Sequence, residues 1–148
     1  MSVRVRPTAR TADQVLLSSK AGALKLMQHG TGEVGITRYG SADHSFPYTL
    51  PLDRWTTLTW VADPGRTTLY ADGERVGTVE ASIPLPMRSI GTEKASLRGD
   101  LDELLTWDEA LSPAQVQVAQ QPSHTRVVRG RQVRHVALRH GRLTTETR

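Results

Sequence analysis

Two tight turns in the middle of the chain constrain its fold most. The tripeptide Asp-Pro-Gly at 63–65 and the dipeptide Asp-Gly at 72–73 separate three short runs that are rich in threonine and apolar residues, 55–61, 66–71 and 74–79. Asp-Gly favours a two-residue β-hairpin turn because both residues tolerate positive φ, and proline presets φ at the second position of a turn. The sequence therefore predicts a three-stranded antiparallel meander.

The first strand of this meander has two distinct faces. Side chains alternate along a strand, so Leu58 and Trp60 point one way while Thr57 and Thr59 point the other. One face of an antiparallel sheet can pack on a core while the other meets solvent. We expect Leu58 and Trp60 in the core, and the threonine face in water or facing a ligand.

Short strands separated by turns continue through the first 107 residues. We expect strands at 2–6, 14–18, 23–27 and 33–39, and a closing strand in which Leu101, Leu105 and Trp107 alternate. Ser112 followed by Pro113 predicts one short helix over 113–120, because serine caps a helix and proline fits its first turn. Such a pattern predicts an all-β fold, an antiparallel two-sheet sandwich of jelly-roll type with one short C-terminal helix.

The positive charge of the chain is confined to its end. Residues 1–120 hold 12 Lys and Arg against 14 Asp and Glu, whereas residues 121–148 hold seven arginines and only Glu146. We therefore expect a folded domain over 1–120, a disordered basic tail over 121–148, and no nucleic-acid partner. No apolar run approaches the roughly 18 residues of a membrane span, and the first residues lack the apolar segment of a secretory signal.

Two groups of residues could carry a function. Asp100 and Asp102 share one strand face beside Glu103, but the next position on that face is Leu104, so we favour a structural role over glycosidase chemistry. The second group lies within 38–48, where aromatic rings that can stack on sugars mix with hydrogen-bonding side chains. Its candidate carbohydrate-binding residues are Arg38, Tyr39, Asp43, His44, Phe46 and Tyr48. The alternative that Phe46 and Tyr48 merely pack stays open.

Several segments resemble one family. They are Trp55-x-x-Leu-x-Trp60, then Thr-Leu-Tyr-Ala-Asp-Gly-Glu-Arg-Val-Gly at 68–77, Leu-Pro-Met-Arg-Ser-Ile-Gly at 85–91, Gly-Asp-Leu-Asp-Glu at 99–103 and Trp-Asp-Glu-Ala-Leu-Ser at 107–112. In this order they resemble a laminin-G-like, concanavalin A-like lectin/glucanase domain, and the resemblance covers about 2–120. The stretches 16–39 and 45–51 further resemble the lectin-like module that follows the catalytic domain in some bacterial family 20 glycosidases, the β-N-acetylhexosaminidases.

The resemblance implies a non-catalytic carbohydrate-binding module that is an accessory part of a larger glycoside hydrolase. Its partner would be a glycan or a neighbouring glycosidase domain, and it would be extracellular if that enzyme is secreted. Two alternatives remain: a hydrolase in its own right that uses Asp100, Asp102 or Glu103, and a structural module that packs on a catalytic domain.

Many domains of this family bind Ca²⁺ at one rim of the sandwich. Four aspartates could supply oxygen ligands for it, although no calcium-loop motif is present and two of the four are explained by their turns. They are Asp63, Asp72, Asp100 and Asp102. We expect no metal or other cofactor, with Ca²⁺ as the alternative.

The resemblance also implies an earlier strand. The family's sandwich opens with a strand before the one equivalent to 2–6, and that strand pairs near 101–107, whereas this chain has Met1 there. We therefore expect a domain that lacks its first strand, an exposed sheet edge and self-association through that edge. Deletion of 122–148 is then expected to leave the melting temperature nearly unchanged.

Overall fold

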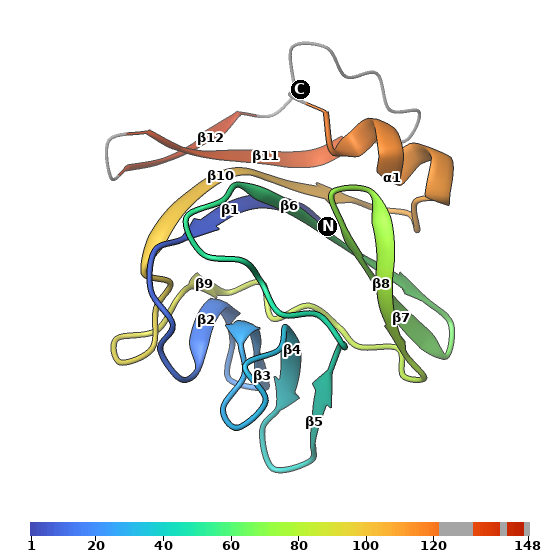
Figure 1. The fold of residues 1–148 in the computed structure, drawn as a ribbon. Helices are drawn as coiled ribbons and strands as arrows, with labels where there is room; N and C mark the ends of the chain where they lie inside the picture. Colours follow the sequence, from blue (N-terminus) through green and yellow to red (C-terminus); the bar gives the residue numbers. More distant parts are fainter. Residues whose placement is uncertain (122–131, 140–141, 147–148) are drawn as a thin grey trace.

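The computed structural model describes residues 1–121, 132–139 and 142–146. Two antiparallel sheets stack face to face as a jelly-roll sandwich, which confirms the predicted fold class (Figure 1). The elements are β1 (Ser2–Pro7), β2 (Gln14–Ser18), β3 (Gly22–Met27), β4 (Gly35–Arg38), β5 (Ala42–Ser45), β6 (Thr56–Asp63), β7 (Arg66–Ala71), β8 (Glu74–Val79), β9 (Ser89–Ile90), β10 (Gly99–Trp107), α1 (Pro113–Ala119), β11 (Gln132–Arg139) and β12 (Arg142–Glu146).

One sheet has seven strands in the order β12-β11-β10-β1-β6-β7-β8, and the other has five in the order β5-β4-β3-β2-β9. The predicted meander is β6, β7 and β8, with Asp63 paired to Arg66 at one turn and Ala71 to Glu74 at the other. Asp72 (φ 49°) and Gly73 (φ 83°) both have positive φ, as a type I′ hairpin turn requires. The meander prediction is confirmed.

The core lies between the sheets. Leu58, Trp60 and Leu69 of the seven-stranded sheet pack there with Leu24 and Ile36 of the five-stranded sheet, all at 2% exposure or less. The inward face predicted for β6 is therefore confirmed. We call the two sides of the seven-stranded sheet its inner face, which packs on this core, and its outer face.

The alternation predicted for β10 is wrong in its second half. Leu101 and Leu104 pack on the main core, whereas Trp107 packs in a separate cluster on the outer face. Glu103 has φ 48°, and the register against β1 shifts there, from Arg4 opposite Asp102 to Ser2 opposite Leu105. A β-bulge inserts one residue and moves every later side chain to the other face.

The tail differs in part from the expected disorder. Within it, β11 pairs with β10 from Leu104 to Trp107, and β12 pairs with β11. The prediction of disorder also covers residues outside the described ones, namely 122–131, 140–141 and 147–148. For these residues it stays a prediction. In the described part of the chain, β1 lies between β10 and β6, and β10 lies between β1 and β11. Neither strand is therefore the exposed sheet edge that the sequence predicts.

The helix α1 lies against the outer face of the seven-stranded sheet (Figure 1). Ser112 caps it as predicted, since its Oγ accepts from Gln115 N at 3.3 Å and the Gln115 side chain accepts from Ser112 N at 2.7 Å. Such a reciprocal capping box satisfies two otherwise free amides. Val116 packs in a small second core with Val61 and Tyr70. Within the described residues no helix is long and apolar enough to cross a membrane.

Candidate functional site

The hairpin of β4 and β5 separates the side chains predicted to bind sugar. His44 is paired with Ile36, and Asp43 with Thr37, so the two candidates point to opposite faces of the hairpin. Tyr39 lies at the turn and is 52% exposed. The sequence places these residues near one another along the chain, but the pleat gives them different directions.

The two aromatic residues after this hairpin are part of the fold. Phe46 is fully buried in the main core, and Tyr48 is half-buried and packs against the same core. Burial raises the pKa of the Tyr48 phenol, and the Asp72 carboxylate adds to this effect. Phe46 therefore packs in the core, as the alternative to sugar binding expects, and it has no ring face open to a ligand.

A small cavity adjoins the hairpin. It has a volume of about 170 Å³ and is lined by Ile36, Thr37 and Arg38 of β4 together with the segment 84–86. Pockets for small molecules span roughly 300–1,000 Å³, so this cavity admits no more than part of one sugar.

A much larger groove lies on the outer face of the seven-stranded sheet. We call it the α1 groove; it has a volume of about 1030 Å³. The outward side chains of β6, β7 and β8 form its floor, and the segment that leads into α1 forms one wall. Its lining includes Val61, Asp63, Arg66, Thr68, Tyr70, Gly73, Glu74, Arg75, Thr78, Glu80, Leu111, Pro113, Gln115 and Gln117.

The floor of the α1 groove is polar. Thr68 and Thr78 face each other across β7 and β8 with their hydroxyl oxygens 3.3 Å apart. Tyr70 is only 9% exposed, and no hydrogen bond from its hydroxyl occurs within the described residues. The groove therefore offers three hydroxyl groups on two adjacent strands.

The position of α1 depends on the turn between β7 and β8. Gln117 Nε2 donates to Gly73 O at 2.8 Å, and a Cβ at Gly73 would lie only 2.6 Å from Gln120 Nε2. A residue with a side chain would thus displace the two glutamine side chains of α1 from the turn, in addition to the strain of positive φ. The same glycine forms the hairpin turn and leaves room for the side chains of α1 that contact it.

The candidate catalytic carboxylates are engaged within the sheet. Asp100 Oδ2 accepts from Nε and Nη2 of Arg6 at 2.8 and 2.6 Å, and Asp102 Oδ1 accepts from Glu103 N at 2.9 Å. The Arg6 guanidinium also lies 5.5 Å from the centre of the Trp55 ring, and that of Arg4 lies 4.8 Å from it. These contacts support the structural role favoured from the sequence.

The aspartates considered for Ca²⁺ do not meet. Asp63 and Asp72 follow opposite ends of the β6–β7 ladder, and each is engaged locally: Asp63 lies 3.8 Å from Arg66, while Asp72 accepts from Thr57 N at 2.8 Å and from Arg54 at 2.9 Å. Within the part of the chain that the structure describes, no group of three or more His, Asp or Glu side chains is arranged to hold a metal ion.

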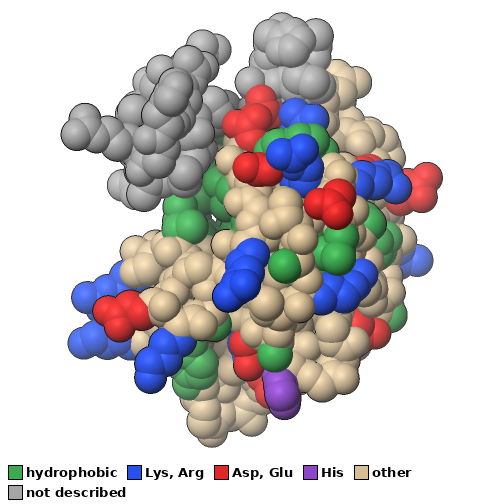
Figure 2. Space-filling model, turned by 60° about the vertical axis from the view of Figure 1, so that its left-hand side comes forward, with side chains coloured by type: hydrophobic (Ala, Val, Ile, Leu, Met, Phe, Trp, Pro, Cys, Tyr) green, Lys and Arg blue, Asp and Glu red, His purple; other side chains and the backbone are tan. Residues whose placement is uncertain are grey.

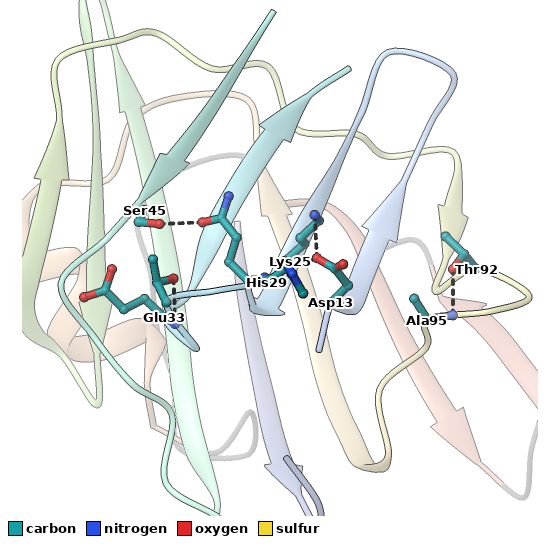
Figure 3. A network of polar contacts seen from close by, with 9 residues as sticks. Asp13, Lys25, His29, Glu33, Ser45, Thr92 and Ala95 are labelled. Atoms are coloured by element: carbon teal, nitrogen blue, oxygen red, sulfur yellow. Dashed lines mark hydrogen bonds and ion pairs between the residues drawn. The ribbon is translucent and has the colours of Figure 1, made fainter. Parts of the chain in front are cut away.

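A network of polar contacts ties the end of the five-stranded sheet together (Figure 3). Lys25 Nζ donates to Asp13 Oδ1 at 2.7 Å, and His29 N donates to the same oxygen at 3.3 Å. The hydrogen bond from Lys25 holds the pKa of the Asp13 carboxyl below its usual value. In the same region Ser45 donates to Gln28 Oε1 at 2.5 Å. Asp13, Lys25 and Ser45 have partners within the network, which indicates a structural role, whereas the buried Gln28 Nε2 has no hydrogen-bond partner among the described residues.

The sequence did not single out the α1 groove. Arg66, Thr68 and Tyr70 follow one another at every second position, which marks a polar outward face, but the facing wall is contributed by α1, more than 40 residues later. Lys and Arg side chains are interspersed with Asp and Glu on the face seen in Figure 2, as expected from the near balance of charge over 1–120.

Comparison with known proteins identifies the family. Residues 1–117 match the sequence profile of the concanavalin A-like lectin/glucanases superfamily, in its laminin-G form. The chain belongs to this family, which confirms that part of the resemblance. No curated protein matches the sequence significantly.

Solved structures share the fold. A candidate carbohydrate-binding protein from Bacteroides ovatus has a TM-score of 0.64 at 13% identity, covering 99% of this chain and 52% of its own. Domain 4 of AbnA, an extracellular GH43 arabinanase from Geobacillus stearothermophilus solved with arabinotriose, has a TM-score of 0.60 at 21% identity, covering 81% and 65%. A heptameric SAP-like pentraxin from Limulus polyphemus has 0.63 at 20%, covering 99% and 79%.

Proposed function

We propose that this chain is a non-catalytic carbohydrate-binding module that acts as an accessory part of a larger, secreted glycoside hydrolase. The observation that carries the proposal is the α1 groove, a wide trough lined by hydroxyl, amide and charged side chains, on a fold whose candidate catalytic carboxylates are engaged by Arg6 and by the backbone. Sugar hydroxyls need many such donors and acceptors.

The solved structures support the same function by analogy of fold. One is described as carbohydrate-binding, and another is a domain of a glycosidase bound to a trisaccharide. A family 20 β-N-acetylhexosaminidase remains our proposal for the parent enzyme on the segments 16–39 and 45–51, which makes N-acetylglucosamine oligomers the first ligands to test.

The test is binding of the purified chain to an array of glycans, followed by titration calorimetry on the best ligand. We expect binding without hydrolysis of aryl N-acetylhexosaminides or β-glucans. Turnover that Asp102→Asn abolishes would instead establish the hydrolase alternative.

A structural role has one observation in its favour. Met87 and Ile90 are 48% and 38% exposed and lie close together along the chain, as expected of a contact with a neighbouring domain. A chain that binds no glycan on the array, but forms a stable complex with its catalytic domain that Met87→Ser and Ile90→Ser weaken, would favour this second function.

A further inference from the structure

The α1 groove combines the hydroxyl of a mostly buried tyrosine with charged groups, and the described residues offer neither a partner. Tyr70 is more than nine-tenths buried at the groove floor, without a hydrogen bond for its hydroxyl among the described residues. Glu74, Arg75 and Glu80 are exposed along the same groove and form no ion pair within that part of the chain. The Tyr70 ring thus packs in the outer cluster while its hydroxyl, without a partner among the described residues, is available to a ligand.

The charges indicate which glycans the groove accepts. Arg66 lies near Asp63, which leaves Arg75, Glu74 and Glu80 as the charged side chains of the groove that form no ion pair with a described residue. Ionised carboxylates accept hydrogen bonds only, and they accept from sugar hydroxyls more strongly than neutral acceptors do, while a guanidinium donates to sugar oxygens. Sulfate or uronate groups would meet like charge here, at a cost that a neutral sugar avoids.

The size of the groove indicates the length of the ligand. Its volume of about 1030 Å³ lies at the top of the range of small-molecule sites, and it extends along β7 from Arg66 beyond Tyr70. A single sugar would leave most of the lining in water. The cavity beside the hairpin of β4 and β5 has a volume of about 170 Å³ and offers no such length.

Resting on the proposed function, we propose that the α1 groove is the glycan site and that its ligand is a neutral oligosaccharide, with Tyr70, Arg75 and the Thr68–Thr78 pair as its binding residues. The hairpin that carries Tyr39 is then not the glycan site.

The test uses the full chain and matched trisaccharides in titration calorimetry. Galactotriose and trigalacturonate differ in the carboxylate on each sugar, and arabinotriose and the N-acetylglucosamine trimer extend the neutral set. We expect the neutral ligands to bind and trigalacturonate to bind at least tenfold more weakly. We expect Arg75→Gln to weaken the best neutral ligand about tenfold, which corresponds to about 1.4 kcal/mol.

Three further variants separate site from fold. Tyr70→Phe removes only the hydroxyl, so we expect severalfold weaker binding at a nearly unchanged melting temperature. The double variant Glu74→Gln with Glu80→Gln removes the two carboxylates that repel a charged sugar. We expect it to reduce the difference in affinity between galactotriose and trigalacturonate. Arg38→Gln with Tyr39→Ala is the matched surface control, and we expect unchanged affinity.

Each other outcome overturns the proposal in a distinguishable way. Glycan binding that only the Arg38 and Tyr39 variant weakens would place the site on the hairpin and leave the proposed function standing. Tighter binding of trigalacturonate than of galactotriose would overturn the ligand class. A wild-type chain that binds none of these sugars and no glycan on the array would overturn both this inference and the proposed function.

Discussion

The inner and outer faces of the seven-stranded sheet use the same strands for different purposes. On the inner face, Leu58 and Leu69 are fully buried in a core that both sheets share. On the outer face of the same two strands, Val61 and Tyr70 pack in a small cluster with Trp107, Leu111 and the short helix α1, and other outward side chains line the α1 groove. A face that one small helix covers in part can leave polar groups accessible, which a continuous core cannot.

The largest expected difference between the faces is in stability. Leu58→Ala removes a fully buried side chain from the inner face, and such a change costs about 2–5 kcal/mol of unfolding free energy. Val61→Ala on the outer face removes fewer carbons from a smaller cluster, so we expect a loss of about 1–2 kcal/mol. Urea denaturation of both variants measures this, and equal losses would contradict the distinction between the two faces.

The inner face also contains a buried group that makes the stability of the protein depend on pH. In a chain that begins at Met1, the terminal amine is buried and donates to Trp60 O at 3.0 Å, and burial lowers its pKa from 8.0 to about 5. Between these pH values the unfolded chain binds a proton that the folded chain does not, so stability falls as pH falls. A shift of three units corresponds to at most about 4 kcal/mol.

The measurement is urea denaturation at pH 8.5 and pH 5. Acetylation of the terminal amine removes this titration and leaves all side chains unchanged, so the acetylated protein is the control. If both forms lose the same stability between these pH values, the terminal amine is not responsible for the loss.

The tail tests whether the edge of the same sheet is covered. In the structure, four residue pairs join β10 to β11. A disordered tail, as interpreted from the sequence, would make no such contacts, so its removal would leave the stability unchanged. On the structure, we expect deletion of 122–148 to expose the amides of β10, to lower stability by on the order of 2 kcal/mol and to promote self-association. An unchanged melting temperature with a monomeric product would support the disordered tail.

The sequence predicted what depends on neighbours along the chain. The hairpin turn at Asp72 and Gly73 and the cap at Ser112 are local, and both are found in the structure. The bulge at Glu103 was missed because nothing in the alternation of β10 marks an inserted residue, and it reversed the face of Trp107.

The candidate site was harder to predict because it combines distant segments. Tyr70 and Gln115 line one groove although 45 positions separate them. The sugar-binding interpretation of 38–48 relied on composition, which does not tell a buried aromatic residue such as Phe46 from an exposed one such as Tyr39. Composition identified residues suited to a sugar, but only the packing of α1 shows which side chains meet.

A smaller effect is expected at the wall of the groove. Ser112→Ala removes the helix cap, and loss of such a cap costs about 1 kcal/mol. Because α1 forms one wall of the groove, we expect weaker glycan binding as well. Ser112→Asp keeps a capping oxygen and is the control; equal behaviour of the two variants in thermal melts would show that the cap does not hold α1 in place.

The smallest effect is expected far from both faces, in the polar network of the five-stranded sheet. Asp13 has positive φ (58°), which asparagine tolerates, so Asp13→Asn removes the charge without straining the backbone. The side chain is 38% exposed, and an ion pair of this kind contributes less than about 1 kcal/mol at pH 7.

The contribution of this ion pair depends on pH. Because Lys25 lowers the pKa of the Asp13 carboxyl in the folded protein, the pair stabilises the fold above the unfolded pKa, and this stabilisation disappears as pH falls through the folded pKa. Urea denaturation is expected to show a small difference in unfolding free energy between wild type and variant at pH 7, and no difference at pH 2.5. A gap that stays constant with pH would assign the effect to packing instead of to the Lys25 pair.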